Sequence, residues 1–537
     1  MTPKRIRPLP WISAIPALLL AILACSFPTA GSPPTSPTPW LPLIATALPT
    51  PAPAATATAM PPLSSPAPAY QPVFKPAPCD FAVPAGYSPQ CGYLVVPENR
   101  AVTGGASIQL HVAIFRSTAE GPDPDPVVHL AGGPGSSSLD VAAYLFGRGL
   151  NAILDRRDFI LFDQRGTGHS LPRLACPERD ALTPALLDGS LSEDAALQAT
   201  VDAFRRCRER LVSQGIDLAA YNSAASAADI NDLRLVLGVD RLNLYGDSYG
   251  TRLALTVMRD YPQAVRSVVL DSTYPLEVNL YTTLAPNAER SFDALFDECA
   301  ADPACNAAYP DLRNFFYNLV DRLNANPVMV SLSVGGTDYS VRLDGNRLMD
   351  VLFGGMYNPV VTAGMPKMIY QVQRGEYSIL RERLALYFDT SSALGMGMSV
   401  QCAEEVPFNA AGDAFEASKA ARPEIAAFFP HSVQYMFSVC QDWTGLAPDP
   451  RENQPVTSDI PALILAGELD PITPPAWGQM TAGHLSRAGF YEFRGNGHWV
   501  TRSSGCALSM ALAFWDNPQA VPDAACLQSQ PGLHFLP

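Results

Sequence analysis

The sequence predicts an α/β fold in which a mainly parallel sheet is flanked by helices and interrupted by a large, mostly helical insertion. Two observations support this prediction. Short apolar runs bounded by Gly, Pro or charged residues alternate with segments of helical periodicity up to residue 274, and the alternation resumes after residue 461. Strands that alternate with helices pair in parallel, because each helix carries the chain back along one face of the sheet.

The predicted strands are residues 92–97, 108–116, 127–130, 159–162, 242–245, 265–270, 462–466 and 490–493. Helical spacing at 225–238 and 251–261 surrounds the strand at 242–245. The residues between 275 and 458 break the alternation. Helices are predicted there at 291–299, 312–324 and 379–387, with a hairpin near 328–342. An insertion at this point would lie over the carboxyl ends of the strands, where open α/β sheets bind ligands, so we predict a lid.

The N-terminal segment differs in composition from the rest of the chain. Residues 1–25 have basic residues, an apolar stretch and then Ala24 before Cys25, which predicts a signal peptide. A small residue directly before a cysteine resembles a bacterial lipobox, so Cys25 is the predicted lipidation site; ordinary cleavage near Ala30 is the alternative. Residues 26–78 are dominated by Pro, Ala, Ser and Thr and predict an unfolded linker.

The remaining chain divides into a first part of the core at 79–274, a lid at 275–458 and a C-terminal part of the core at 459–537. The N-terminal segment contains four of the 36 basic residues and none of the 51 acidic ones, so the folded part has a net charge of 32 minus 51, or −19. Such a surface repels nucleic acid and anionic membranes. Membrane attachment would therefore depend on the lipid alone.

Ten cysteines follow Cys25. An even number in an exported chain predicts disulfides rather than a metal site, and no CxxC or HExxH pattern is present. We expect five bridges between sequence neighbours, although sequence alone does not fix the connectivity. The expected pairs are Cys79–Cys91, Cys176–Cys207, Cys299–Cys305, Cys402–Cys440 and Cys506–Cys526.

A candidate nucleophile stands between a predicted strand and a predicted helix. The motif Gly246-Asp247-Ser248-Tyr249-Gly250 has the GxSxG pattern in this strand-turn-helix context. The turn is sharp, so only small residues fit on either side of the serine. A serine hydroxyl needs a base to remove its proton. We therefore predict that Ser248 is the nucleophile of a serine hydrolase.

The base and its acid should follow the serine in the chain. Among seven histidines, His498 follows the last predicted strand in the turn Gly495-Asn496-Gly497, which makes it the candidate base. Asp470 follows the strand at 462–466 and precedes a proline that restricts its backbone, so we choose it over Glu468 as the acid. Asp271, after the strand at 265–270, is the remaining alternative.

Two backbone N–H groups should stabilise the negative charge of the tetrahedral intermediate. Tyr249, directly after the serine, supplies one by position. The glycine-rich turn Ala131-Gly132-Gly133-Pro134-Gly135 follows the strand at 127–130, and Gly133 is our choice for the second donor. A phosphate-binding loop is the competing interpretation, but no Gly-Lys-Ser/Thr sequence follows.

Together these motifs resemble peptidase family S33, and within it the tripeptidyl aminopeptidases related to prolyl aminopeptidases, which have the α/β-hydrolase fold. The resemblance spans roughly residues 90–505 and rests on five motifs. They are Gly132-Gly133-Pro134-Gly135, Asp163-Gln164-Arg165-Gly166-Thr167-Gly168-His169-Ser170, Gly246-Asp247-Ser248-Tyr249-Gly250-Thr251, Asp470-Pro471-Ile472-Thr473-Pro474 and Gly497-His498. One departure is that Leu130 and Ala131 separate His129 from the glycines, which leaves His129 a structural role.

The resemblance implies an extracytoplasmic serine peptidase that releases a single residue or a tripeptide from peptides with a free N-terminus, without metal or cofactor. It also implies an acid that binds the substrate ammonium group, for which Glu404 is the first candidate and Glu405 the second. Asp163 and Arg165 are expected to brace the oxyanion turn. An esterase or lipase with the same residues is the enzyme alternative, and an inactive binding protein is the alternative from another class.

Overall fold

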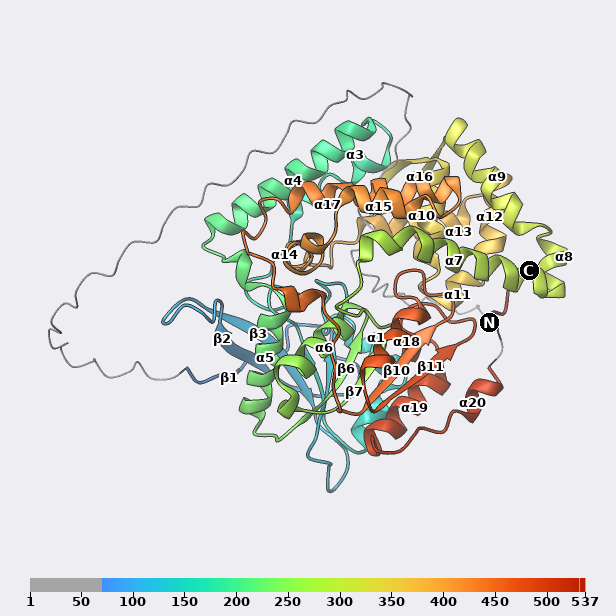
Figure 1. Ribbon diagram of the computed structural model, residues 1–537. Helices are drawn as coiled ribbons and strands as arrows, with labels where there is room; N and C mark the ends of the chain where they lie inside the picture. Colours follow the sequence, from blue (N-terminus) through green and yellow to red (C-terminus); the bar gives the residue numbers. More distant parts are fainter. Residues whose placement is uncertain (1–69, 531, 537) are drawn as a thin grey trace, which may run out of the picture. The chain divides into compact units, whose positions relative to one another are not determined.

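The computed structural model describes residues 70–530 and 532–536 (Figure 1). The predicted signal peptide, the lipidation of Cys25 and the linker up to residue 69 lie outside the described residues. No helix in the described part of the chain is both long and apolar enough to cross a membrane.

A nine-stranded, mainly parallel sheet forms the centre of the core. Its order is β1-β2-β3-β5-β4-β6-β7-β10-β11. Strands β1 to β3 are antiparallel and form one edge, whereas β5, β4, β6, β7, β10 and β11 run in parallel. The bounds are β1 Val73–Pro76, β2 Gln90–Pro97, β3 Ser107–Phe115, β4 Val127–Leu130, β5 Phe159–Phe162, β6 Leu242–Asp247, β7 Val265–Asp271, β10 Ala462–Gly467 and β11 Ala488–Phe493.

Helices cover both faces of this sheet, as predicted. They are α1 Ala142–Gly147, α5 Ser223–Leu237, α6 Tyr249–Asp260, α18 Pro475–His484, α19 Gly505–Asp516 and α20 Ala525–Gln528. Alternate residues of a strand serve opposite faces: Leu244 of β6 packs in the apolar cluster that contains α5 and α6, and Tyr245 packs in the cluster that contains α1 and α19. Burial on both faces explains why these strands are continuous apolar runs without polar alternation.

The eight predicted strands are confirmed, with ends that differ by a few residues. Strand β1 was not predicted. Residues 73–76 were assigned to the unfolded linker, but they pair antiparallel with β2, from Val73 opposite Val95 to Pro76 opposite Gly92. The linker assignment is therefore wrong for these four residues, because an edge strand needs hydrogen bonds on one side only and tolerates proline.

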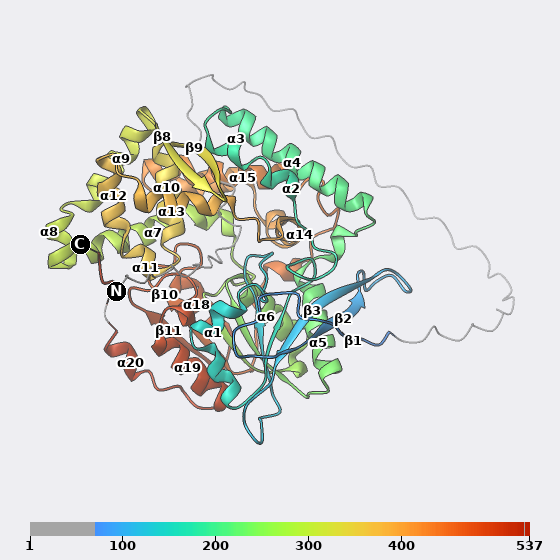
Figure 2. The same ribbon diagram turned by 180° about the vertical axis from the view of Figure 1, so that it is seen from behind.

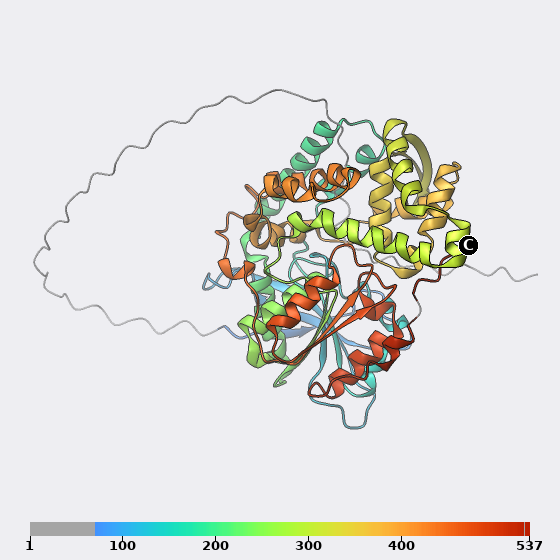
Figure 3. The same ribbon diagram turned by 45° about the vertical axis from the view of Figure 1, so that its right-hand side comes forward.

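The chain between β7 and β10 forms the predicted helices and hairpin, and lies over the carboxyl ends of the strands (Figures 1 and 3). Its helices are α7 Leu280–Ala301, α8 Pro303–Ala308, α9 Leu312–Ala325, α10 Gly345–Gly355, α11 Pro359–Thr362, α12 Met365–Gln373, α13 Ser378–Leu384, α14 Leu394–Glu404, α15 Ala411–Ser418, α16 Pro423–Ser432 and α17 Gln434–Val439. The hairpin consists of β8 Val328–Val334 and β9 Thr337–Leu343.

A second segment joins this lid. Helices α2 Pro177–Asp180, α3 Thr183–Leu187 and α4 Glu193–Ser213 belong to residues that were assigned to the core, yet α4 contacts α17 and α14, and α3 contacts β9. Figure 2 shows α3 and α4 beside the lid helices. The 21-residue helix α4 is capped by Ser192, whose side chain accepts a hydrogen bond from Ala195 N. The lid is thus built from two separate stretches of the chain.

All five expected disulfides are present with the expected pairing. The bridge Cys402–Cys440 ties the end of α14 to the end of α17. A bridge between sequence neighbours mainly removes disorder from the unfolded chain, and the effect grows with the length of the closed loop.

We therefore expect two of the lid bridges to stabilise the protein unequally. The Cys402→Ala/Cys440→Ala variant opens a bridge with a separation of 38 residues and should lose about 4 kcal/mol of unfolding free energy. The matched variant Cys299→Ala/Cys305→Ala opens a separation of 6 and should lose about 2 kcal/mol. Urea denaturation of both variants measures the difference, and a larger loss for the short loop would contradict the loop-length explanation.

Candidate active site

The candidate nucleophile lies in the sharp turn between β6 and α6. Ser248 has φ 54° and ψ −125°, a backbone conformation that a residue with a side chain rarely adopts. Such a turn brings backbone segments very close together. A Cβ atom on Gly250 would lie 1.8 Å from the carbonyl oxygen of Leu130, and one on Gly246 would lie 2.4 Å from the carbonyl oxygen of Gly250. The two glycines of the motif are thus sterically required.

The predicted oxyanion turn lies against this serine. It follows β4, which neighbours β6 in the sheet, so both chain segments leave the sheet at the same edge. A Cβ atom on Gly132 would be 2.8 Å from the Cβ atom of Ser248. Gly133 has φ +109°, where side chains are disfavoured. The turn therefore places the backbone of Gly132 beside Ser248. The roles of Gly133 and Tyr249 as backbone donors to the oxyanion stay predictions.

His498 and Asp470 are in direct contact. Nδ1 of His498 is 2.8 Å from Oδ2 of Asp470, and both side chains are buried. The hydroxyl of Thr473 donates to the same Oδ2 at 2.7 Å and lies 3.0 Å from the imidazole. The amides of Ile472 and Thr473 donate to Oδ1. This contact selects the His498 tautomer that carries its proton on Nδ1, which leaves Nε2 as the acceptor.

The carboxyl of Asp470 is held in its charged form. Burial raises its pKa, but the charge of His498 and the hydrogen bonds from His498 and Thr473 outweigh burial, so the pKa lies below its usual value. Thr473 belongs to the motif Asp470-Pro471-Ile472-Thr473-Pro474, but the sequence does not predict its contact with both Asp470 and His498.

Asp271, the alternative acid, does not contact His498. Its carboxylate accepts hydrogen bonds from the amides of Val500 at 2.6 Å and Thr501 at 2.8 Å, two and three residues after the histidine. Its carbonyl oxygen accepts from Ser248 N at 3.0 Å, and Ser272 Oγ accepts from Trp499 N at 2.7 Å. Burial raises the pKa of Asp271 to about 6, although Thr501 and Val500 oppose this. The end of β7 thus anchors both the serine turn and the histidine loop.

Three further side chains lie near the site: two come from the lid, and one is a buried histidine of the core. The ring of Tyr357, after α10, lies 4.7 Å from the His498 ring. Arg290 of α7 donates to the carbonyl oxygens of Glu468 and Asp470. His129 is buried and lies 2.8 Å from Asp247, which agrees with its structural role. No sequence signal marked Tyr357 or Arg290, because both reach the site from distant parts of the chain.

The two residues expected to brace the oxyanion turn differ in position. Asp163 accepts hydrogen bonds from Ser137 Oγ and Leu139 N, directly after the turn, so this expectation is confirmed. Arg165 instead pairs with Asp229 of α5 at 2.7 Å and donates to the carbonyl oxygen of Ala220. The expectation for Arg165 is therefore wrong, since its guanidinium joins α5 to the backbone at Glu98, directly after β2, and at Ala220.

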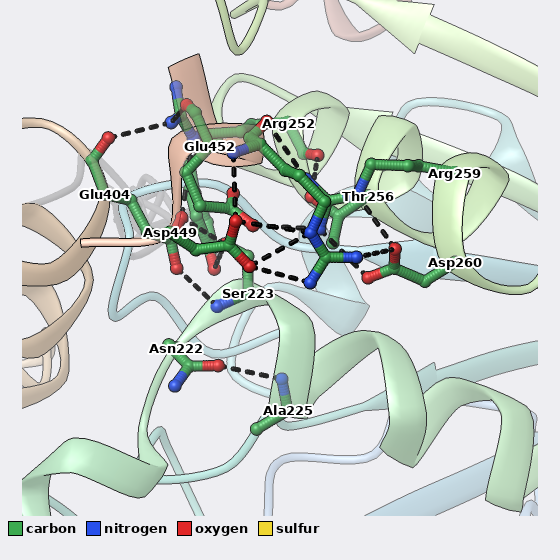
Figure 4. A network of polar contacts seen from close by, with 12 residues as sticks. Asn222, Ser223, Ala225, Arg252, Thr256, Arg259, Asp260, Glu404, Asp449 and Glu452 are labelled. Atoms are coloured by element: carbon green, nitrogen blue, oxygen red, sulfur yellow. Dashed lines mark hydrogen bonds and ion pairs between the residues drawn. The ribbon is translucent and has the colours of Figure 1, made fainter. Parts of the chain in front are cut away.

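The glutamates Glu404 and Glu405 are each 3% exposed, and both carboxylates lie near the guanidinium of Arg252. Figure 4 shows Glu404 in the buried polar network around Arg252. Glu404 accepts from the amide of Ser223 at 2.5 Å and from its hydroxyl at 2.6 Å. Glu405 accepts from the Tyr274 hydroxyl and from Leu280 N. Burial and the nearby Glu452 raise the pKa of Glu404 to about 7, although Arg252 opposes this. Both carboxylates already have protein donors, and their predicted role as ammonium ligands stays a prediction.

A large groove lies elsewhere, at the amino ends of the parallel strands. It is lined by residues that include Pro126, Val265 and Pro461, each adjacent to the start of a strand. Ser248, Asp470 and His498 do not line it. In open α/β sheets the ligand site lies at the carboxyl ends, so this groove does not change the position of the candidate site.

A serine in a strained strand-helix turn and a buried Asp–His pair at the same carboxyl edge of a parallel sheet are together typical of serine hydrolases. The model of the family described as the alpha/beta hydrolase fold matches residues 125–501, so the chain belongs to the α/β-hydrolase family. The predicted fold class is confirmed.

Named relatives agree with the resemblance to family S33. The chain is 25% identical over 470 residues to "Serine protease Hip1" of Mycobacterium tuberculosis, covering 81% of this chain and 86% of that protein. It is 29% identical over 195 residues to "Tripeptidyl aminopeptidase" of Streptomyces lividans, covering 34% and 35%. It is also 26% identical over 449 residues to "Carboxylesterase B" of Mycobacterium tuberculosis, covering 79% and 84%.

The close approach at Gly250 can be tested by one methyl group. We expect Gly250→Ala to lose about 3 kcal/mol of unfolding free energy or more, because the added Cβ meets the Leu130 carbonyl oxygen, which is backbone and cannot move aside. Gly147→Ala is the matched control, since a Cβ there meets nothing within 4 Å. Thermal unfolding compares the two, and equal melting temperatures would contradict the steric argument.

Proposed function

We propose that the protein is a serine hydrolase that forms an acyl-enzyme on Ser248, with His498 as the base and Asp470 as the acid that orients it. The observation that carries the proposal is the contact of 2.8 Å between His498 Nδ1 and Asp470, at the sheet edge where Ser248 adopts its strained conformation. The turn at Ser248 and the loop that contains His498 both bond the end of β7, which favours a common function for the serine and the histidine.

In the proposed reaction, His498 Nε2 accepts the proton of the Ser248 hydroxyl while Oγ bonds to the substrate carbonyl carbon. The carbonyl oxygen becomes an oxyanion, which the backbone N–H groups of Tyr249 and Gly133 stabilise. Collapse of this intermediate breaks the scissile bond, and the imidazolium returns its proton to the leaving group. Water then attacks the acyl-enzyme with His498 again as base, which releases the acid and restores Ser248. Asp470 stays ionised throughout.

We further propose that the substrate is a peptide with a free N-terminus, from which a single residue or a tripeptide is released. Support comes from the motif resemblance and from relatives named as a serine protease and a tripeptidyl aminopeptidase. The predicted ammonium ligands Glu404 and Glu405 do not strengthen it, since ammonium binding would have to displace their donors. The relative named carboxylesterase B keeps ester hydrolysis as a second candidate activity.

We propose an extracytoplasmic location for the enzyme. Five disulfides in one chain are typical of an oxidising compartment, and they support export. Lipidation of Cys25, with the membrane reached through that anchor alone, remains part of the proposal. Metabolic labelling with a palmitate analogue would test it, and a labelled Cys25→Ala variant would contradict it.

Substrates with different N-termini separate the proposed activities. We expect the full chain to react with a fluorophosphonate probe, and Ser248→Ala not to, because the probe phosphonylates the activated serine. Chromogenic anilides of one and three residues should be cleaved faster with a free N-terminus than with an acetylated one. Faster cleavage of the acetylated forms would contradict the aminopeptidase assignment. A preference for a short-chain ester over all peptides would favour the esterase.

The acid assignment predicts a large and selective effect. Asp470→Asn should lower kcat by about 10⁴-fold with little change in KM, since the amide would hold the imidazole in the wrong tautomer. Glu468→Gln is the matched control, because Glu468 bonds Gly495 N rather than the histidine. We expect it to lower kcat by less than about 10-fold. A comparable loss in both variants would contradict the choice of Asp470.

A further inference from the structure

We propose that helix α14 of the lid positions both backbone donors of the oxyanion hole, and that Glu404 is the positioning residue at Tyr249. The inference rests on the hydrolase function proposed above. The helix begins at Leu394 and ends at Glu404, and its two ends contact two different parts of the site. Each end can be followed through hydrogen bonds and close contacts.

The C-terminal end reaches the residue after the nucleophile through one hydroxyl. The Tyr249 hydroxyl lies 2.8 Å from Ser223 Oγ, which in turn donates to Glu404 Oε2 at 2.6 Å. Because Ser223 Oγ donates to the carboxylate, the Tyr249 hydroxyl is the donor to Ser223. All three side chains are buried. These two hydrogen bonds fix the position of the Tyr249 side chain, and so the position of the Tyr249 N–H group next to Ser248.

The N-terminal end of α14 contacts the glycine-rich turn that contains Gly133, the second predicted donor of the oxyanion hole. Ala393 N, at the start of α14, donates to the carbonyl oxygen of Gly135 at 2.9 Å. The contact is close, since a Cβ atom on Gly135 would lie 2.7 Å from the Ala393 carbonyl oxygen. Gly397, one turn further, faces the carbonyl oxygen of Pro134, at 3.1 Å from the position of a Cβ atom. These contacts restrain the turn that contains Gly133.

Arg252 keeps the C-terminal end of the helix in place. It lies on α6, one turn after Tyr249, and donates to the carbonyl oxygens of Glu404 at 3.0 Å and Glu452 at 2.7 Å. Its Nε is 3.4 Å from the Glu404 carboxylate. The disulfide Cys402–Cys440 constrains the same turn of α14. A rigid helix fixed at both ends can set the separation between the two donors.

This role differs from binding a substrate ammonium group in what it predicts for substrates. An oxyanion hole serves every acyl substrate, so loss of positioning should reduce hydrolysis of esters and peptides alike. An ammonium ligand contributes only to substrates with a free N-terminus. The two roles of Glu404 are therefore separable by comparing a short-chain p-nitrophenyl ester with a free tripeptide anilide.

The test uses the full-length protein with the single substitutions Tyr249→Phe, Ser223→Ala and Glu404→Gln. Each substitution breaks the series of hydrogen bonds from Tyr249 through Ser223 to Glu404. We expect kcat per active site, counted by labelling to completion with the fluorophosphonate probe, to fall about 10- to 100-fold on both substrates, with KM within roughly twofold. The double variant Ser223→Ala/Tyr249→Phe should fall no further than either single variant, because the links act as a unit.

Thr256→Val is the matched control. It removes a buried hydroxyl on the same helix as Tyr249. The Thr256 hydroxyl bonds the Arg252 carbonyl oxygen at 3.0 Å and takes no part in the hydrogen bonds that join Tyr249, Ser223 and Glu404. We expect its kcat per active site to be unchanged even where its melting temperature falls. A purely structural role would lower melting temperature and labelled fraction without changing kcat per labelled site, and would overturn the inference.

Other results would overturn either the inference about Glu404 or the proposed hydrolase function. Unchanged ester kcat in Tyr249→Phe and Ser223→Ala would overturn the inference, and so would a Glu404→Gln variant that only raises KM for the free tripeptide. Either result would leave the proposed hydrolase function intact. A wild-type chain that neither reacts with the probe nor hydrolyses either substrate would contradict the proposed function, and the inference with it.

Discussion

The site depends on one steric constraint, which is the sharp turn at Ser248. The turn forces β6, α6 and the segment after β4 to approach at distances that no side chain would permit, and Gly132, Gly246 and Gly250 stand at the contacts. The same constraint recurs at the histidine loop. A Cβ atom on Gly467 would lie 2.0 Å from the Gly497 carbonyl oxygen, and one on Gly497 would lie 2.0 Å from that of Met356. Glycine at these positions lets the core and lid backbones touch.

Strain of this kind persists only where the surroundings determine it. Here the end of β7 does so, since Asp271 and Ser272 bind the backbone on both sides of the site. Ser272 and Trp499 themselves have positive φ values of 63° and 65°. Trp499 N donates directly to Ser272, and Ser248 N donates to the carbonyl oxygen of Asp271, the residue before Ser272. The three unusual backbone positions are thus all held at the end of β7.

Sequence could predict the parts of this arrangement that are local. The strand-turn-helix order identified Ser248, and the turns after β10 and β11 identified Asp470 and His498, because parallel strands bring their carboxyl ends to one edge. Long-range contacts left no such signal. Helices α2 to α4 join the lid although they interrupt the core sequence, and Arg252 meets residues 152 and 200 positions away. Nothing in a local window distinguishes a buried glutamate paired with arginine from a ligand for a substrate.

The network around Arg252 shows why the lid is part of the site and more than a cover. Arg252 is 1% exposed and bonds the carbonyl oxygens of Pro275, Glu404 and Glu452, which belong to three separate segments. Moving α14 away would remove the carbonyl oxygen and the carboxylate of Glu404 from this buried guanidinium, and breaking such a buried pair typically destabilises a protein by about 3–5 kcal/mol. That penalty fixes the C-terminal end of α14 relative to α6. Any movement that admits substrate must therefore come from parts of the lid that Arg252 does not hold.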